Sequence, residues 1–155
     1  TLIADLSAVR HGFFTTELII NNPNLAKIDD LYIISINRMY LSHLALTLFK
    51  VHETYKKFRC VTPASEVDRF KAIIKSIENR KAIVLRNKFF CHIIDNDTKE
   101  PLDENLLQTY FDQFTNNNVD ELLGWSILND DSVFNQLEII RNKFMTTYQI
   151  PIGDI

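Results

Sequence analysis

The most constraining feature of the sequence is a long stretch that contains no helix breaker. Residues 25–61 include neither glycine nor proline, and apolar side chains recur there every three or four positions. That spacing places them on one side of an α-helix. A β-branched patch at residues 32–36 would suit a strand locally, but the uninterrupted length favours a helix. We therefore predict a helix that is capped at residues 29–30 and runs to about Phe58.

Amphipathic segments of the same kind cover most of the remaining chain. Further helices are predicted at residues 2–20, from Pro63 to about Ile94, from about 102 to 114, from 119 to 128 as a short helix, and from 132 to about 148. Three glycines and four prolines are too few for a many-turned β fold. The predicted fold class is all-α, an up-and-down helical bundle of four main helices with an extra short helix. Residues 1–155 are expected to form a single domain.

Charge and cysteine content narrow the range of partners and compartments. The formal net charge is −3, which argues against strong nonspecific binding of nucleic acid and requires any RNA contact to be concentrated in a small site. Cys60 and Cys91 form no CxxC pair, so a reduced cytoplasmic protein is expected, with one disulfide in a secreted protein as the alternative. No uncharged apolar stretch approaches 18 residues, so we expect no membrane-spanning helix.

One segment, residues 85–94, combines chemically active side chains inside an apolar run. Arg86 offers a planar, permanently charged fork that suits a phosphate, and His92 can accept or donate a proton near neutral pH. Asn87 and Lys88 are expected to support phosphate binding beside Arg86. Together these groups could cleave RNA without a metal ion.

Helical geometry does not place Arg86 and His92 on one stripe. His92 follows Arg86 by six positions, which corresponds to about 9 Å along the helix and about 120° around it. Arg86 must then bend towards His92 of its own chain, or two copies must meet and share a cleft. A purely structural interpretation is also open, in which Arg86, Lys88 and His92 stabilise the last carbonyls of a helix.

The run Arg-Asn-Lys-Phe-Phe-Cys-His at residues 86–92 resembles the Arg-x(4–6)-His signature of the HEPN superfamily. Asn87 occupies the polar position that often follows the arginine in that family. A long amphipathic helix precedes the motif and a polar loop follows it, as in the abortive-infection and toxin-like branch. The resemblance implies a dimeric helical bundle in which Arg86 and His92 form a metal-independent endoribonuclease site, with no cofactor.

The same resemblance implies partners. RNA is the expected substrate, a second copy completes the cleft, and an antitoxin such as a nucleotidyltransferase is a possible partner in a toxin–antitoxin or phage-defence system. Some HEPN toxins carry a tyrosine two residues after the histidine, where the partner modifies it. Ile94 stands at that position here, which puts this form of regulation in doubt. The alternative function is a catalytically inactive HEPN-like helical dimer that acts as a protein-binding module.

Other motifs are incomplete. The segment that begins at His52-Glu53 resembles a zinc-protease motif, but Lys56 stands where the second ligand belongs. His43 and His52 are expected on opposite faces of one helix, so they cannot form a local metal pair. Residues 85–89 and 140–144 share an Arg-Asn-Lys-Phe core, but the match ends there because Thr147 replaces the histidine. We interpret this similarity as coincidence.

Overall fold

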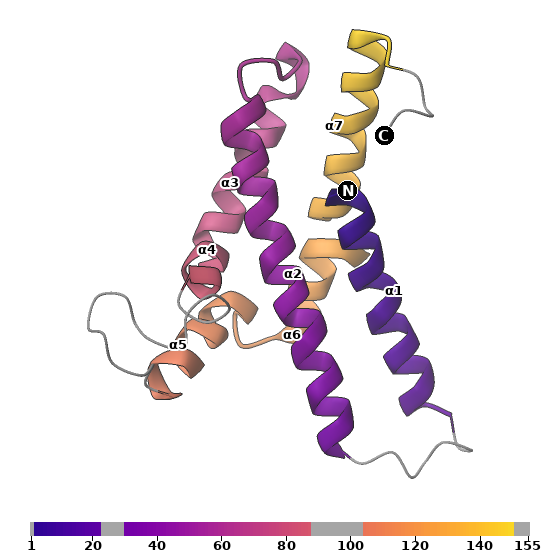
Figure 1. Cartoon of the computed structure of the whole chain (residues 1–155), viewed down its shortest axis with the longest axis vertical. Helices are drawn as coiled ribbons and strands as arrows, with labels where there is room; N and C mark the ends of the chain where they lie inside the picture. Colours follow the sequence, from indigo (N-terminus) through magenta and orange to yellow (C-terminus); the bar gives the residue numbers. More distant parts are fainter. Residues whose placement is uncertain (1, 23–29, 88–103, 151–155) are drawn as a thin grey trace.

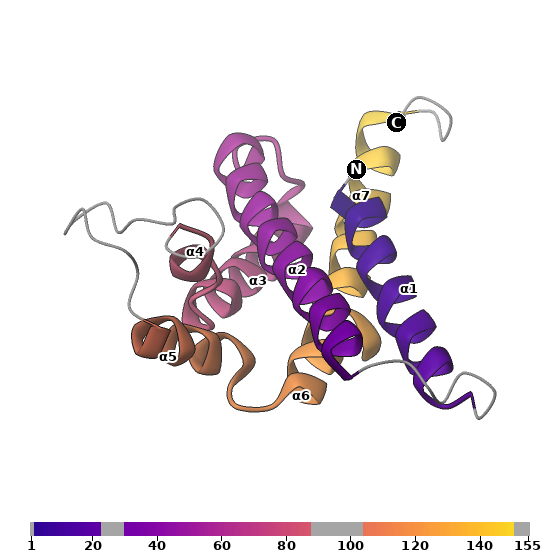
Figure 2. The same ribbon diagram turned by 60° about the horizontal axis from the view of Figure 1, so that its bottom comes forward.

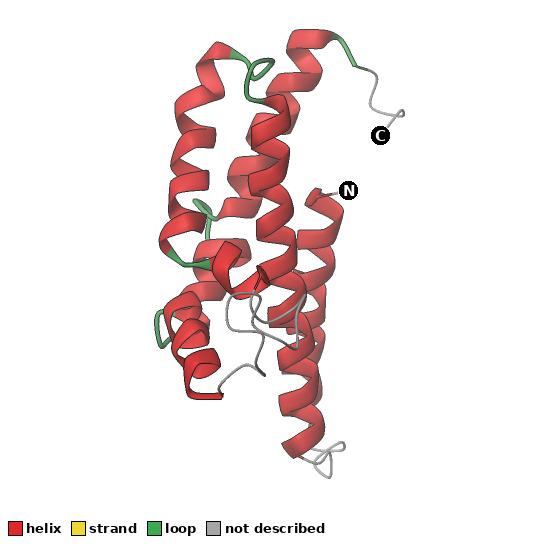
Figure 3. Cartoon of the chain, turned by 60° about the vertical axis from the view of Figure 1, so that its left-hand side comes forward, coloured by secondary structure: helices red, strands yellow, loops and turns green. Residues whose placement is uncertain are grey.

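The computed structural model describes residues 2–22, 30–87 and 104–150, and the described residues are helical without any strand. The all-α class is therefore confirmed (Figure 3). In chain order the elements are α1 (Leu2–Ile20), α2 (Asp30–Phe58), the single 3-10 turn η2 (Ala64–Glu66), α3 (Val67–Asn79), α4 (Ala82–Leu85), α5 (Glu104–Thr115), α6 (Val119–Leu123), the π-helical turn η4 (Gly124–Leu128) and α7 (Val133–Tyr148).

Helix α2 is the centre of the molecule. It packs against α1 on one side and against α3 and α4 on the other, while α7 contacts both α1 and α3 (Figure 1). Helix α5 lies apart from α1 and α7, next to α4 and α6 (Figure 2). None of the described helices combines the length and the apolar character that crossing a membrane requires.

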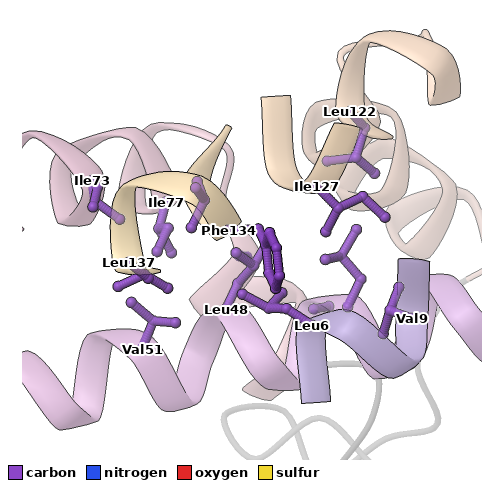
Figure 4. Packing of buried hydrophobic residues seen from close by; sticks show 14 of the residues in the cluster. Leu6, Val9, Leu48, Val51, Ile73, Ile77, Leu122, Ile127, Phe134 and Leu137 are labelled. Carbon is purple, nitrogen blue, oxygen red and sulfur yellow. The ribbon is translucent and has the colours of Figure 1, made fainter. Parts of the chain in front are cut away.

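The hydrophobic core is centred on α1, α2, α3 and α7 and also includes residues of α4, α5, α6 and η4. Leu44, Leu48 and Val51 of α2 are completely buried, as the apolar spacing of this helix predicts. Figure 4 shows Leu48 and Val51 with other members of the cluster, which include Leu6, Val9, Ile73, Ile77, Leu122, Ile127, Phe134 and Leu137. Burial of such a cluster is the main force that holds the helices together.

Three apolar side chains near helix ends are not buried. Ile20, Phe58 and Leu106 are 50%, 51% and 38% exposed. Each lies in the first or last turn of its helix, where the neighbouring helices no longer cover it. The helical period gives the direction of a side chain, but the position of the partner helix decides whether that direction is buried.

The predicted continuous helix at residues 63–94 is also wrong, because the chain breaks after Asn79. Pro63 caps the short turn η2, and α3 ends at Asn79. Lys81 then adopts a left-handed conformation with φ of 56°, and α4 begins at Ala82. Residues 88–94 lie outside the described part of the chain. The predicted up-and-down arrangement of four main helices is not confirmed.

Arg80 explains why the chain breaks at this point. Its side chain is only 16% exposed, and its Nη2 donates to Glu121 Oε1 at 2.6 Å. The guanidinium carbon lies 4.6 Å from the ring centroid of Trp125, and Nη1 donates to the carbonyl oxygen of Phe114 at 3.5 Å. These contacts join the α3–α4 junction to α5, α6 and η4. Tertiary contacts have therefore overridden the local preference for a continuous helix.

Glu121 is expected to stabilise the fold in a pH-dependent way. Hydrogen bonds from Asn116 and from Arg80 hold the pKa of Glu121 below its ordinary value of 4.5. Since the pKa is lower in the folded state, this contribution is complete above the unfolded pKa and is lost as the pH falls through the folded pKa. In urea unfolding, wild type should exceed Glu121→Gln in stability at about pH 6, and the difference should shrink at about pH 3. A difference that stays constant between the two pH values would contradict the assignment.

The turn and the helix caps of the second half arise from local side chains. Asn116 and Asn117 have φ of 53° and 55°, a left-handed conformation that asparagine tolerates better than most residues. Asn118 caps α6, because its side chain accepts a hydrogen bond from the backbone of Glu121 at 3.1 Å. Ser132 caps α7 in the same way. The chain reversal between α5 and α7 is thus encoded locally.

Candidate functional site

Arg86 follows α4 and is positioned by the two buried residues of that helix. Ala82 and Leu85 are completely buried. The backbone N–H of Arg86 points back to the carbonyl oxygens of Ala82 and Ile83, so the helical path continues to this residue. Helix α4 packs on α2, α3 and α5. The Arg86 side chain therefore starts from a backbone that these three helices hold in place.

The guanidinium group of Arg86 is supported from two directions. Its central carbon lies 4.3 Å from the ring centroid of Phe49 in α2, a cation–π distance. Its Nη1 donates to Oδ1 of Asn87 at 2.9 Å. Its Nε is buried and has no hydrogen-bond acceptor among the described residues. A guanidinium carries five N–H donors, so the Arg86 guanidinium retains donors that can bind an anion.

A groove on α2 extends from this guanidinium. We call it the Arg86 groove, and it has a volume of about 680 Å³. With Arg86 it is lined by Met39, Ser42, His43, Leu46, Phe49 and Lys50. At about 100° per residue these α2 positions fall within an arc of about 120°, on the side opposite the buried core stripe. The groove is therefore a surface feature, shaped by the solvent-facing side of α2 and the end of α4.

The electrostatic character of the Arg86 groove is positive. Arg86 and Lys50 are cationic, and none of the described lining residues is acidic. Lys50 pairs with Asp5 of α1 at 2.9 Å, which balances one of the two charges. The charge of Arg86 has no carboxylate partner among the described ion pairs. In a chain with a net charge of −3, this is a local site for an anion.

The structure brings together only part of the predicted site. Arg86 and Asn87 are adjacent and hydrogen-bonded. Lys88 and His92 lie outside the described residues, so their roles, and the pairing of Arg86 with His92 within one chain or between two, stay predictions. The sequence interpretation missed His43, which it considered only as a metal ligand. The signal was present, because apolar Met39, Leu46 and Phe49 interrupt the solvent-facing side of α2.

The second Arg-Asn pair tests whether the local motif alone makes a site. An Arg141 N–H also donates to Oδ1 of the following residue, Asn142, at 3.2 Å. Arg141, however, lies 3.7 Å from Glu138 and borders a different and mainly apolar groove of about 1090 Å³. The Arg-Asn contact is thus a feature of the dipeptide. What distinguishes Arg86 is the aromatic ring beneath it and a groove with no acidic side chain among its described lining residues.

The remaining histidines have structural surroundings. His52 is buried, and its Nε2 donates to Glu78 Oε1 at 3.1 Å. The hydrogen bond from Lys56 is the main cause that holds the pKa of the neighbouring Glu53 below its ordinary value. His11 bonds through Nδ1 to the carbonyl oxygen of Ser7 on the surface of α1. Within residues 2–22, 30–87 and 104–150, no group of three or more His, Cys, Asp or Glu side chains is arranged to hold a metal ion.

Comparisons of the chain with models of protein families, with curated proteins and with solved structures found no significant match. The functional interpretation therefore depends on the chemistry of the described residues and on the sequence pattern at residues 86–92. Two properties of the Arg86 groove carry that chemistry. One is a guanidinium held in a fixed orientation, and the other is an apolar and aromatic wall beside it.

Proposed function

We propose that the protein is a HEPN-like, metal-independent endoribonuclease with its site at Arg86. The supporting observation is the guanidinium of Arg86, which Phe49 and Asn87 hold at the edge of a groove whose described lining residues include no acidic side chain. Such a group binds a phosphodiester and stabilises the additional negative charge of the transition state. The imidazole of His92 would transfer a proton, while Asn87 and Lys88 support phosphate binding.

The proposal includes assembly and biological setting. The helices α1, α2, α3 and α7 would form the HEPN-type bundle, and two copies would join so that their Arg86 and His92 residues share a cleft. The substrate is RNA, and the protein would act in the cytoplasm as the toxin of a toxin–antitoxin or abortive-infection system. An antitoxin such as a nucleotidyltransferase would then control it.

Cleavage of RNA in the presence of EDTA tests this proposal. Purified protein should cut an RNA oligonucleotide, and Arg86→Ala and His92→Ala should each reduce the rate about 100-fold or more, since each removes a group used in the transition state. Arg86→Lys should restore only part of the rate, because lysine keeps the charge but loses the planar fork.

Arg141→Ala is the matched control for Arg86→Ala. Both arginines precede an asparagine to which they donate, but only Arg86 lies over an aromatic ring in the groove. The control should cleave RNA at the wild-type rate. Equal rates for wild type, Arg86→Ala and His92→Ala, or no cleavage by wild type, would contradict the enzymatic function.

A protein-binding helical dimer is the second candidate function. It is favoured by two apolar side chains one turn apart on α1, Phe14 and Leu18, which are 44% and 73% exposed. Adjacent exposed apolar side chains often mark a contact with another protein. A dimer in solution that fails to cleave RNA, and that dissociates when Leu18 is replaced with Lys, would support this alternative over the enzyme.

A further inference from the structure

We propose that His43 is a second functional imidazole of the Arg86 groove, and that it transfers one of the two protons exchanged when a phosphodiester is cleaved there. This inference rests on the proposed ribonuclease function and adds a catalytic residue to it. His43 belongs to α2 and lines the same groove as Arg86, although the two residues are far apart in the sequence. His43 itself lies in the described part of the chain, and the other proton-transfer group is the His92 of the proposed function.

The position of His43 suits a ligand held by Arg86. Phe49, which lies under the guanidinium, follows His43 by six residues, which is about 9 Å along α2 and about 120° around it, so the two residues stand at opposite edges of the groove. Leu46 lies between them and lines the same groove. We therefore place the scissile phosphodiester over Leu46, where Arg86 approaches it from one side and His43 from the other.

The backbone that carries His43 is fixed. The next two residues, Leu44 and Ala45, are completely buried in the core, and the His43 side chain is half-buried. A side chain that projects from a packed helix is positioned more accurately than one on a loop. His43 is thus held at the groove before any ligand arrives.

The chemistry requires more than one proton-transfer step. The 2′-oxygen of the ribose attacks phosphorus, so that the bond from phosphorus to O2′ forms and the bond to O5′ breaks. The proton of the 2′-hydroxyl passes to a base, and an acid supplies a proton to O5′, which leaves a 2′,3′-cyclic phosphate and a 5′-hydroxyl. A mechanism with a separate base and acid needs two such groups, and residues 86–92 contain one histidine.

His43 is the described groove residue that fits this second role. Arginine stays protonated in proteins, so Arg86 can bind the phosphate but cannot exchange a proton. Lys50 is engaged with Asp5 at 2.9 Å. An imidazole both accepts and donates protons near neutral pH. The positively charged groove would bring the phosphodiester to it.

The test compares the pH dependence of kcat/KM for RNA cleavage in EDTA. His43→Gln and His43→Ala should lower the rate about 100-fold or more and remove one limb of a bell-shaped pH profile. Added imidazole should restore part of the activity of His43→Ala. His11→Gln changes a histidine that lies on the surface of α1 and does not line the Arg86 groove. It should leave both the rate and the profile unchanged.

A binding measurement separates a folding defect from a lost proton transfer. When a non-cleavable 2′-O-methyl RNA is added, the imidazole NMR resonances of His43 should shift in the wild type, and those of His11 should not. Unaltered His43 resonances, or a His43→Gln variant with the wild-type rate and pH profile, would overturn the inference. If Arg86→Ala is inactive while His43→Gln is active, the proposed function stands and His43 is excluded. If the wild type itself does not cleave RNA, the proposed function fails first.

Discussion

Replacing Phe114 with alanine should lower the free energy of unfolding by about 3–5 kcal/mol, the usual cost of truncating a buried phenylalanine. Phe114 is completely buried in the last turns of α5, and it ranks among the largest side chains with no exposed surface. Its carbonyl oxygen also accepts a hydrogen bond from Arg80. The truncation would open a cavity where α5 joins the rest of the molecule, and urea unfolding followed by circular dichroism should measure the loss.

Phe58→Ala is the matched control, because Phe58 is also near a helix end but is 51% exposed. It should cost less than about 1 kcal/mol, since little apolar surface is lost from the core. Phe114→Leu, which keeps most of the volume, should cost less than Phe114→Ala. Similar losses for Phe58→Ala and Phe114→Ala would show that α5 does not depend on Phe114 for its attachment.

Gly12→Ala should destabilise the protein near the upper end of the range of about 1–3 kcal/mol that overpacking usually costs. A β-carbon at Gly12 would overlap Cε1 and Cζ of Tyr40, so the tyrosine ring would have to move. That ring also packs on Phe13, with their centroids 5.4 Å apart. The expected sign is unusual, because alanine in place of glycine normally stabilises a helix by about 1 kcal/mol.

The Tyr40→Ala background separates the two effects on the helix. Without the ring, Gly12→Ala should become neutral or stabilising, because only the helix preference remains. Gly124→Ala provides a second comparison, since its β-carbon would lie 3.1 Å from the side-chain amide of the exposed Asn129, which has room to move. A destabilisation by Gly12→Ala that persists without Tyr40 would exclude the ring as its cause.

The sequence predicted well those helices whose ends are determined by residues next to them in the chain. Helix α1 ends at Ile20 because Asn21, Asn22 and Pro23 follow, and α2 is continuous because nothing in it breaks a helix. The break at Lys81 has another origin. It accompanies the contacts of Arg80 with residues 34 and 41 positions further along the chain. No pattern within residues 63–94 identifies Phe114 and Glu121 as the partners of Arg80.

The candidate site likewise contains residues that the local sequence identified and residues that only the packing of the helices brings together. Arg86 and Asn87 were found from the sequence because they are neighbours in one motif, and the structure shows a hydrogen bond between them. Phe49 and His43 join Arg86 only through the packing of α4 on α2. Sequence periodicity placed His43 and His52 on opposite faces of one helix, but it contained no information about which other segment would lie beside His43.

The left-handed residue Lys81 has a consequence for the cooperativity of unfolding. The break at Lys81 separates Ala82–Leu85 from the hydrogen-bonded ladder of α3, so this segment gains no stability from the length of α3. The order of α4 therefore depends on the burial of Ala82 and Leu85 against α2 and α5. Arg86 is attached to a unit that can open locally at a lower free energy than global unfolding requires, so its amide protons and those of α4 should exchange with solvent before those of α3.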